Sequence, residues 1–260
     1  MGDIVIYCII VFALGACFGS FANVCILRIP EKQSIVPHSQ CVFCGRKLRW
    51  FELIPIFSFL ALRGKCYGCK GTISAQYPLI EFANGVLWLL TYVVLGLRSP
   101  TAPLGLTPLT VVYCLAASAL LILAVIDIRT MEIPPALNFC ILMLGFIRVI
   151  LDRSNWYVYV LGFITVSGVL LLLWYITSGR AIGGGDIKLM AVCGLLIGWQ
   201  SIIAAFLLGC VIGTVVHIIR MAFTKAGRVL AFGPYLAAGV FVSMLWGGQI
   251  VEWYLSLYSF

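Results

Sequence analysis

The stretch GGGDIKLMAVCGLLIGWQSIIAAFLLGCVIGTVVHIIR, residues 183–220, decides the class of fold. It contains one acid, Asp186, at the head of an apolar run, and the polar break GWQS at residues 198–201 separates this run from a second one. A hydrocarbon core of about 30 Å needs about 20 apolar residues per helix. The stretch therefore predicts two membrane helices, a short one at 187–199 and a full-length one at 201–220.

The same pattern recurs along the whole chain, which is 63% hydrophobic and only 10% charged, with a mean hydropathy of +1.11. Such a composition excludes an ordinary soluble domain, in which about a quarter of the residues are charged. We predict an all-α polytopic membrane protein with about eight transmembrane helices. The other six spans are expected near residues 4–27, 78–97, 107–126, 135–151, 156–177 and 232–251.

The distribution of basic residues predicts the topology. With eight spans and the N-terminus outside, 14 Lys and Arg residues are cytoplasmic and only Arg98, Arg148 and Arg153 are outside, as the positive-inside rule requires. The loop 28–76 is then cytoplasmic. The net charge of +8 follows from this topology, and because no basic helix is present we expect no nucleic-acid partner.

The TAPLGLTP segment, residues 101–108, is a natural boundary on the outside. It divides an N-terminal part, residues 1–100, with two helices and the loop 28–76, from a six-helix part, residues 101–260. No oligomeric state follows from the sequence.

The loop 28–76 contains two Cys-x-x-Cys motifs, Cys41 with Cys44 and Cys66 with Cys69. Two such pairs at this spacing are typical of tetrahedral zinc, and four protein ligands leave no open position for water. We predict a structural zinc site that folds the loop. The alternative is two disulfides or four free thiols, which a reducing cytoplasm disfavours, and His38 is expected to be a loop residue.

Two of the nine acids stand where an apolar run meets a cytoplasmic loop. Asp127 ends SALLILAVID, and Asp186 begins the short helix behind Gly183 and Gly185. Paired carboxylates share a proton, so one can act as a base toward water while the other donates to a carbonyl oxygen. The glycines would permit close approach of a substrate backbone and a positive φ. The sequence thus predicts an aspartic peptidase site.

Three other interpretations remain open for these acids. Asp186 could be a helix N-cap after an ordinary glycine turn. Asp127 could be a loop acid paired with Arg129. Both could form a proton or cation relay in a transporter, because acids within membranes often mark ion pathways.

Several stretches in this order resemble the type IV prepilin leader peptidases, membrane aspartic peptidases of the GxGD class. They are GSFANVCILRIP at residues 19–30, the cysteine loop with LRGKCYGCKGTISAQYPLIE at 62–81, DIRTMEIP at 127–134, GGGDIK at 183–188 and FGPYLAAG at 232–239. The resemblance covers nearly the whole chain. One departure is Pro135, which stands where the family usually has an acid.

The resemblance implies that Asp127 and Asp186 are the catalytic pair. It implies a bacterial inner-membrane enzyme that removes the basic leader of prepilins or pseudopilins at the cytoplasmic face, after a glycine. The intact cysteine loop implies N-methylation of the new terminus with S-adenosylmethionine as a second activity. Glu81 is expected to contact the methyl donor or the substrate amine, or to be a carboxylate that the helix dipole favours at the N-terminus of its helix. Lys188 is expected to meet a dyad carboxylate or an acidic substrate group, or to extend to the lipid headgroups.

Overall fold

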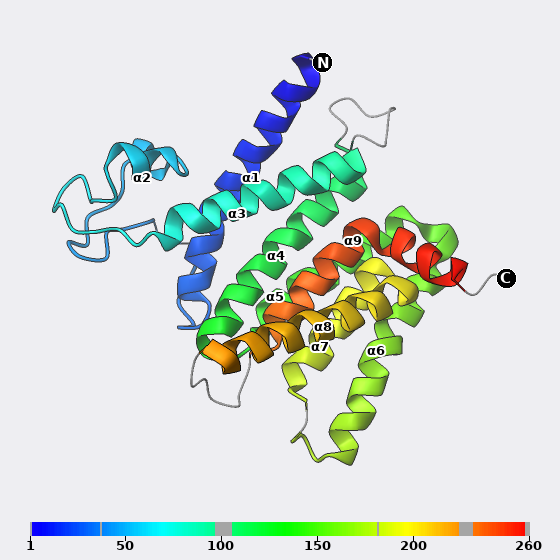
Figure 1. Cartoon of the computed structure of the whole chain (residues 1–260). Coiled ribbons are helices and arrows are strands. Elements are labelled where there is room, and N and C mark those ends of the chain that lie inside the picture. The colour runs from blue at the N-terminus through cyan, green and yellow to red at the C-terminus, as the bar shows by residue number, and fades with distance from the viewer. Residues whose placement is uncertain (1, 37, 97–105, 181, 224–230, 258–260) are drawn as a thin grey trace. The chain divides into compact units, whose positions relative to one another are not determined.

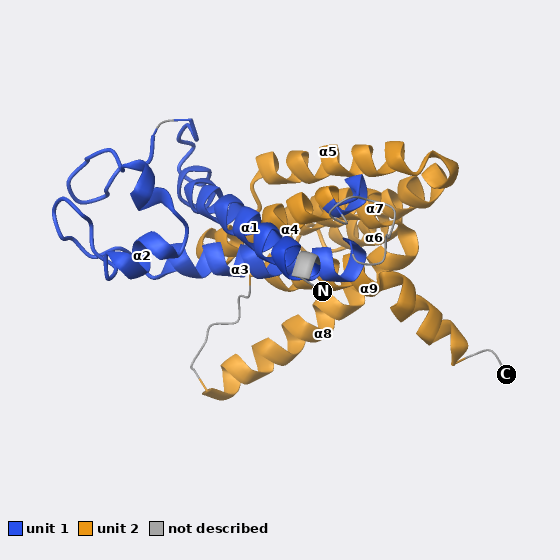
Figure 2. Ribbon diagram, turned by 90° about the horizontal axis from the view of Figure 1, so that it is seen from above, with its two compact units in different colours: residues 1–110 blue, residues 111–260 orange. Residues whose placement is uncertain are grey.

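The computed structural model describes residues 2–36, 38–96, 106–180, 182–223 and 231–257 (Figure 1). Within these ranges the chain is helical, and its only β-structure is two isolated bridges. The chain divides into two compact units, residues 1–110 and 111–260, which Figure 2 colours separately. Each unit is described by itself below.

Unit 1 is built on α1 (Gly2–Arg28) and α3 (Gln76–Thr91), which pack side by side along their length. A Cβ added at Gly15 would lie 2.8 Å from the Cβ of Trp88, and one at Gly19 would lie 2.7 Å from the Cα of Glu81. As the residue number increases along α1, from Gly15 to Gly19, the number of the contacted residue on α3 decreases, so the helices are antiparallel. Small residues allow this close approach, which replaces the hydrophobic effect as the source of helix pairing in lipid.

The segment between these two helices contains little regular structure. It has a 3₁₀ turn, η1 (Trp50–Leu53), and one short helix, α2 (Phe57–Ala61). A π-helical turn, η2 (Tyr92–Gly96), continues α3. Without a large apolar core of its own, the segment needs another source of stability.

Unit 2 contains the remaining helices, apart from the first residues of α4, which lie before its boundary. They are α4 (Pro108–Thr130), α5 (Pro135–Leu151), η4 (Arg153–Asn155), α6 (Trp156–Ile176), α7 (Gly184–Ile197), α8 (Trp199–Phe223) and α9 (Gly233–Ser256). Pro135 takes the first position of α5, where a missing N–H costs nothing. The departure from the family pattern is therefore accommodated by the helix start.

The short helix α7 is the centre of unit 2, because α5, α6, α8 and α9 all contact it. Every residue from Leu189 to Ile197 is buried. Gly162 of α6 and Gly194 of α7 meet backbone to backbone, where an added Cβ would overlap the opposing carbonyl. A helix that is apolar on all sides and enclosed by others belongs to the core rather than to the lipid surface.

The eight predicted apolar segments all form helices, and the predicted break at GWQS is confirmed by Gly198, which ends α7 with φ +84°. Six of these helices are long and apolar enough to cross a membrane, so the chain is a multi-pass membrane protein. By this criterion α5 and α7 are too short; the 14 residues of α7 extend only about 21 Å. Most of the predicted linker 101–108 lies outside the described residues.

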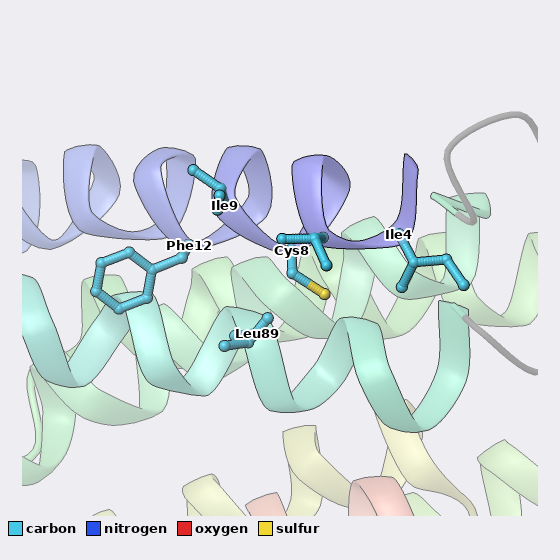
Figure 3. Close-up of a pocket in the computed structure, with 6 residues that line it drawn as sticks. Ile4, Cys8, Ile9, Phe12 and Leu89 are labelled. Atoms are coloured by element: carbon cyan, nitrogen blue, oxygen red, sulfur yellow. The ribbon is translucent and has the colours of Figure 1, made fainter. Parts of the chain in front are cut away.

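The surface of the described helices carries many exposed large apolar side chains, for example Leu171, Leu172 and Ile176 of α6. A water-soluble protein rarely exposes such continuous apolar area, whereas lipid chains cover it without cost. A shallow groove of about 320 Å³ between α1 and α3 belongs to the same surface, and its lining offers no charged group for chemistry (Figure 3).

Candidate functional site

Asp127 lies in the last turn of α4 and is only 4% exposed. The interpretation of Asp127 as a loop acid is wrong, because α4 continues to Thr130, beyond the predicted end at residue 126. Its Oδ2 accepts a hydrogen bond of 2.9 Å from the backbone N–H of Gly233, the first residue of α9. A carboxylate at a helix N-terminus is favoured by the free N–H groups and by the helix dipole.

Gly233 is a site residue that the sequence analysis did not single out, although FGPYLAAG was among the matching stretches. A Cβ at this position would lie 2.7 Å from Oδ2 and 3.1 Å from Cγ of Asp127. Only glycine allows the start of α9 to approach the carboxylate this closely. The glycine after Phe232 was the signal available in the sequence.

Asp186 is the third residue of α7, after the N-cap Gly183, and is half-buried. Its carboxylate accepts a hydrogen bond from the backbone N–H of Gly183, the arrangement of the acidic residue in a capping box. The interpretation of Asp186 as the N-cap residue is therefore wrong, because Gly183 occupies the N-cap position. Gly183 has φ −71°, so the expected positive φ is absent there.

The neighbouring glycines differ in what surrounds them. A Cβ at Gly185 would lie 3.1 Å from the Cβ of Ile133, whereas one at Gly184 would meet nothing within 4 Å. A side chain at 185 would therefore press on Ile133, just before α5, whereas open space remains at 184.

Asp127 and Asp186 are close enough for electrostatic repulsion between their carboxylates. The helices α7 and α9 begin at this place and α4 ends there. Two helix N-termini directed at the pair compensate part of the cost of burying charge. The arrangement places two acids, each bound by a backbone N–H group, where α4 ends and α7 and α9 begin.

Asn138 is a second residue that the sequence pattern did not reveal. Gly145 of α5 packs on Leu195 of α7, and Ile133 before α5 packs on Gly185, so the two helices run parallel. Asn138 lies on the same buried face two turns before Gly145, level with the first turns of α7. Its Oδ1 is buried and accepts no hydrogen bond within the described residues.

Lys188 is exposed on α7. Residues two apart on a helix point to different sides, so its side chain leaves the helix away from that of Asp186. This placement fits an extension toward solvent or lipid headgroups better than a contact with Asp186.

The four cysteines of the loop form one cluster, with all their sulfur atoms within 4.8 Å of one another. Cys41 Sγ and Cys69 Sγ are 3.8 Å apart. Tetrahedral zinc with Zn–S bonds of about 2.3 Å separates its sulfur ligands by about 3.8 Å, so the cluster fits this metal. His38 is an exposed loop residue and is not part of the cluster.

The two cysteine motifs fold in the same way. Cys41 N–H donates to Arg46 O and Cys66 N–H to Gly71 O, and the turns close with Gly45 and Lys70, both at positive φ. One antiparallel bridge closes each turn, because Gln40 pairs with Lys47 and Lys65 pairs with Thr72. Two equivalent turns thus face each other across the cluster.

Backbone N–H groups favour the thiolate form at two of the four sulfurs. The N–H groups of Cys69 and Gly68 lower the pKa of the Cys66 thiol to about 6. The N–H of Arg46 lowers the pKa of Cys44. Since metal ligation requires thiolates, these bonds favour the binding form.

An ion pair supports the cluster from one side. Arg46 contacts Cys66 Sγ at 3.9 Å and Glu52 Oε1 at 2.6 Å, and the side chain of Glu52 is 3% exposed. Burial raises the pKa of Glu52, but the Arg49 N–H and the Arg46 guanidinium outweigh it and lower the pKa overall. The pair therefore links η1 to the cysteine cluster.

Glu81 belongs to a different polar group, buried between α1 and α3 in unit 1. It is 7% exposed, and Asn84, one turn later, is fully buried and donates to Gly15 O at 2.7 Å. Glu81 Oε2 accepts a hydrogen bond of 2.7 Å from the backbone N–H of Ile56 in the cysteine loop. Part of its hydrogen-bonding capacity is thus already used within the protein.

Two family models match the chain in succession. The Bacterial Peptidase A24 N-terminal domain matches residues 13–95, and the Type IV leader peptidase family matches residues 114–218. The chain belongs to the type IV leader peptidase family. As a member of this peptidase family it is an enzyme, so the transporter interpretation of the two acids is not supported.

Curated relatives agree with this family over nearly their full length. The chain is 36% identical to a prepilin leader peptidase/N-methyltransferase of Bacillus subtilis, over 95% of this chain and 98% of the relative. It is 34% identical to the protein of the same name from Stutzerimonas stutzeri, over 93% and 91% of the two chains. The Pseudomonas aeruginosa relative of that name is 32% identical over 95% and 93%. No solved structure matches the chain.

Proposed function

We propose that this peptidase cleaves type IV prepilins or pseudopilins after a glycine and then N-methylates the new N-terminal residue. The names of the relatives suggest both activities. The observation that carries the peptidase assignment is the pair Asp127 and Asp186, brought together at the head of α7 with Gly233 fixing one carboxylate.

The pair would act through a shared proton. Two neighbouring carboxylates repel when both are charged, so one retains a proton between them. The ionised member removes a proton from a water molecule as the oxygen of that water attacks the scissile carbonyl carbon. The protonated member donates to the carbonyl oxygen. The tetrahedral intermediate collapses as the C–N bond breaks, the departing amine receives the proton taken from the water, and the other carboxylate takes a proton back from a hydroxyl of the intermediate.

Methyl transfer is assigned to unit 1. S-adenosylmethionine would supply the methyl group, and the attacking lone pair is that of the new N-terminal amine, so the chain has only to orient the amine and accept its proton. Glu81 is the candidate for this contact with the donor or the amine. Cys41, Cys44, Cys66 and Cys69 would hold zinc as a structural ion that folds the loop.

The proposed location is the bacterial inner membrane, with the dyad open to the cytoplasm and the inner leaflet. The basic loop 28–76 supports this orientation through the positive-inside rule. A leader that stays on the cytoplasmic side would then reach the pair without crossing the membrane.

The test is mass spectrometry of the N-terminus of a prepilin incubated with membranes that contain the enzyme. We expect loss of the leader after a glycine, and a further gain of one methyl group only when S-adenosylmethionine is added. An intact prepilin would contradict the peptidase assignment, and an unmethylated product in the presence of the donor would contradict the second activity.

A further inference from the structure

We infer that Glu81 is a positioning residue that anchors the cysteine loop to the helix pair of unit 1 through the backbone of Ile56. This goes beyond the proposed function, in which Glu81 contacts the donor or the amine. The activity readout rests on the proposed methyl transfer, whereas the structural readout does not.

The first observation is the conformation of Ile56. It has φ 62° and ψ −54°, and the N–H of Phe57 bonds back to Pro55 O at 2.6 Å. This is the rare three-residue γ-turn with positive φ, which is strained. A β-branched residue with positive φ is an outlier that persists only where its surroundings impose it.

The second observation is the hydrogen bond that imposes this conformation on Ile56. The N–H of Ile56 donates to Oε2 of the buried Glu81 side chain at 2.7 Å, and a hydrogen bond inside a protein is stronger than one in water. The side chain of Ser20 in α1 also hydrogen-bonds with Glu81. The carboxylate is therefore fixed by both α1 and the loop.

The third observation is the close packing of the helix backbones at Glu81. A Cβ on Gly19 would lie 2.7 Å from the Cα of Glu81, so the backbones of α1 and α3 are in direct contact at this level. Glu81 therefore projects from a closely packed part of the helix pair.

The last observation connects the anchor to the cysteine cluster. Ile56 stands four residues after Glu52, and η1 contacts α2 on either side of the strained turn. Glu52 pairs with Arg46, which contacts Cys66. A continuous path thus runs from the helix pair through Glu81, Ile56, Glu52 and Arg46 to the proposed metal site.

The proposal separates two roles of Glu81 that a single alanine variant would confuse. Gln keeps an oxygen that accepts from the Ile56 N–H and loses the negative charge, whereas Ala loses both. An anchor needs the acceptor, while pairing with a cationic amine or donor needs the charge.

The experiment is hydrogen–deuterium exchange of the full-length protein in lipid nanodiscs, together with methylation of a pre-cleaved pilin. We expect the amide of Ile56 to exchange about 10- to 100-fold faster in Glu81→Ala, the factor for leaving a donor without its partner, and to stay protected in Glu81→Gln. Methylation should fall further in Glu81→Ala, which loses both the acceptor and the charge, than in Glu81→Gln, which keeps the acceptor. Glu252→Ala, at an exposed glutamate of α9, is the matched control.

A rescue variant tests the strained turn directly. Because glycine takes positive φ without strain, Ile56→Gly should restore part of the methylation lost in Glu81→Ala. The proposal is overturned if Glu81→Gln loses methylation as completely as Glu81→Ala while Ile56 stays protected. It is also overturned if Glu81→Ala leaves the exchange of Ile56 unchanged. If Glu81→Ala does not accumulate, the exchange of the Ile56 amide in Glu81→Gln decides: protection supports the anchor, and fast exchange overturns it. Failure of the wild type to methylate would count against the proposed function instead.

Discussion

Substitution of Gly233 by alanine should separate the integrity of the fold from the integrity of the carboxylate pair. The new methyl carbon would lie 2.7 Å from Asp127 Oδ2, and ordinary contacts begin at 3.4 Å, so the carboxylate must move by about 0.7 Å. The same movement lengthens its 2.9 Å hydrogen bond from the Gly233 N–H by up to the same amount, to at most about 3.6 Å, which is beyond the range of a hydrogen bond.

The size of the effect follows from this displacement. A lost hydrogen bond to a charged group costs about 1.5–3 kcal/mol. Misplacement of a reacting group by about 1 Å can lower a rate by about a hundredfold. We therefore expect cleavage by Gly233→Ala to fall by about two orders of magnitude, while α9 itself gains helix propensity from alanine.

The assay is the initial rate of prepilin cleavage in membranes at matched expression. Gly248→Ala is the control, because Gly248 lies on the same helix and an added Cβ there meets nothing within 4 Å. Cleavage by Gly233→Ala at the wild-type rate would refute the inference that this glycine positions Asp127.

Three further predictions concern the head of α7 and the cysteine loop. Gly185→Ala should slow cleavage, because its methyl would lie 3.1 Å from a packed isoleucine. Gly184→Ala should not slow cleavage, because a methyl there meets open space. Equal rates of cleavage for the two variants would argue against packing at Gly185. Cys66→Ser, or a zinc chelator, should loosen the loop and reduce methylation more than cleavage, with Cys17→Ser in α1 as the control; equal loss of both activities at normal expression would contradict separate sites. The folded state lowers the pKa of Glu52 below its ordinary value of 4.5. The bonds of this carboxylate therefore stabilise the fold fully above pH 4.5, and this stabilisation is lost as the pH falls below that value. The stability difference between wild type and Glu52→Gln, measured by thermal unfolding of the loop, should therefore shrink at acid pH, and a constant difference would exclude this origin.

The helices could be predicted from the sequence because each apolar run is ended by glycine, proline or charge. α5 was predicted at its observed bounds and the break at Gly198 at its observed place. The burial of α7 could not be predicted in the same way, since a helix that is apolar on all sides has no periodic face to indicate its neighbours.

The candidate site was predictable in its acids and cysteines and not in its supports. Unusual residue types in an apolar chain can be recognised from the sequence alone, as Asp127 and Asp186 were. Gly233 and the Ile56 turn act through backbone groups, and their partners lie 106 and 25 residues away along the chain. Such contacts depend on tertiary packing, which a local pattern does not encode.

The most direct test of the account compares prepilin cleavage by the wild type, Asp127→Asn and Asp186→Asn in membranes at matched expression. Asparagine keeps the size and polarity of each side chain and removes the ability to share a proton. The account predicts that each variant alone loses cleavage by orders of magnitude. Cleavage at a near-normal rate by either variant would contradict the dyad and leave Asp186 as a helix-capping residue.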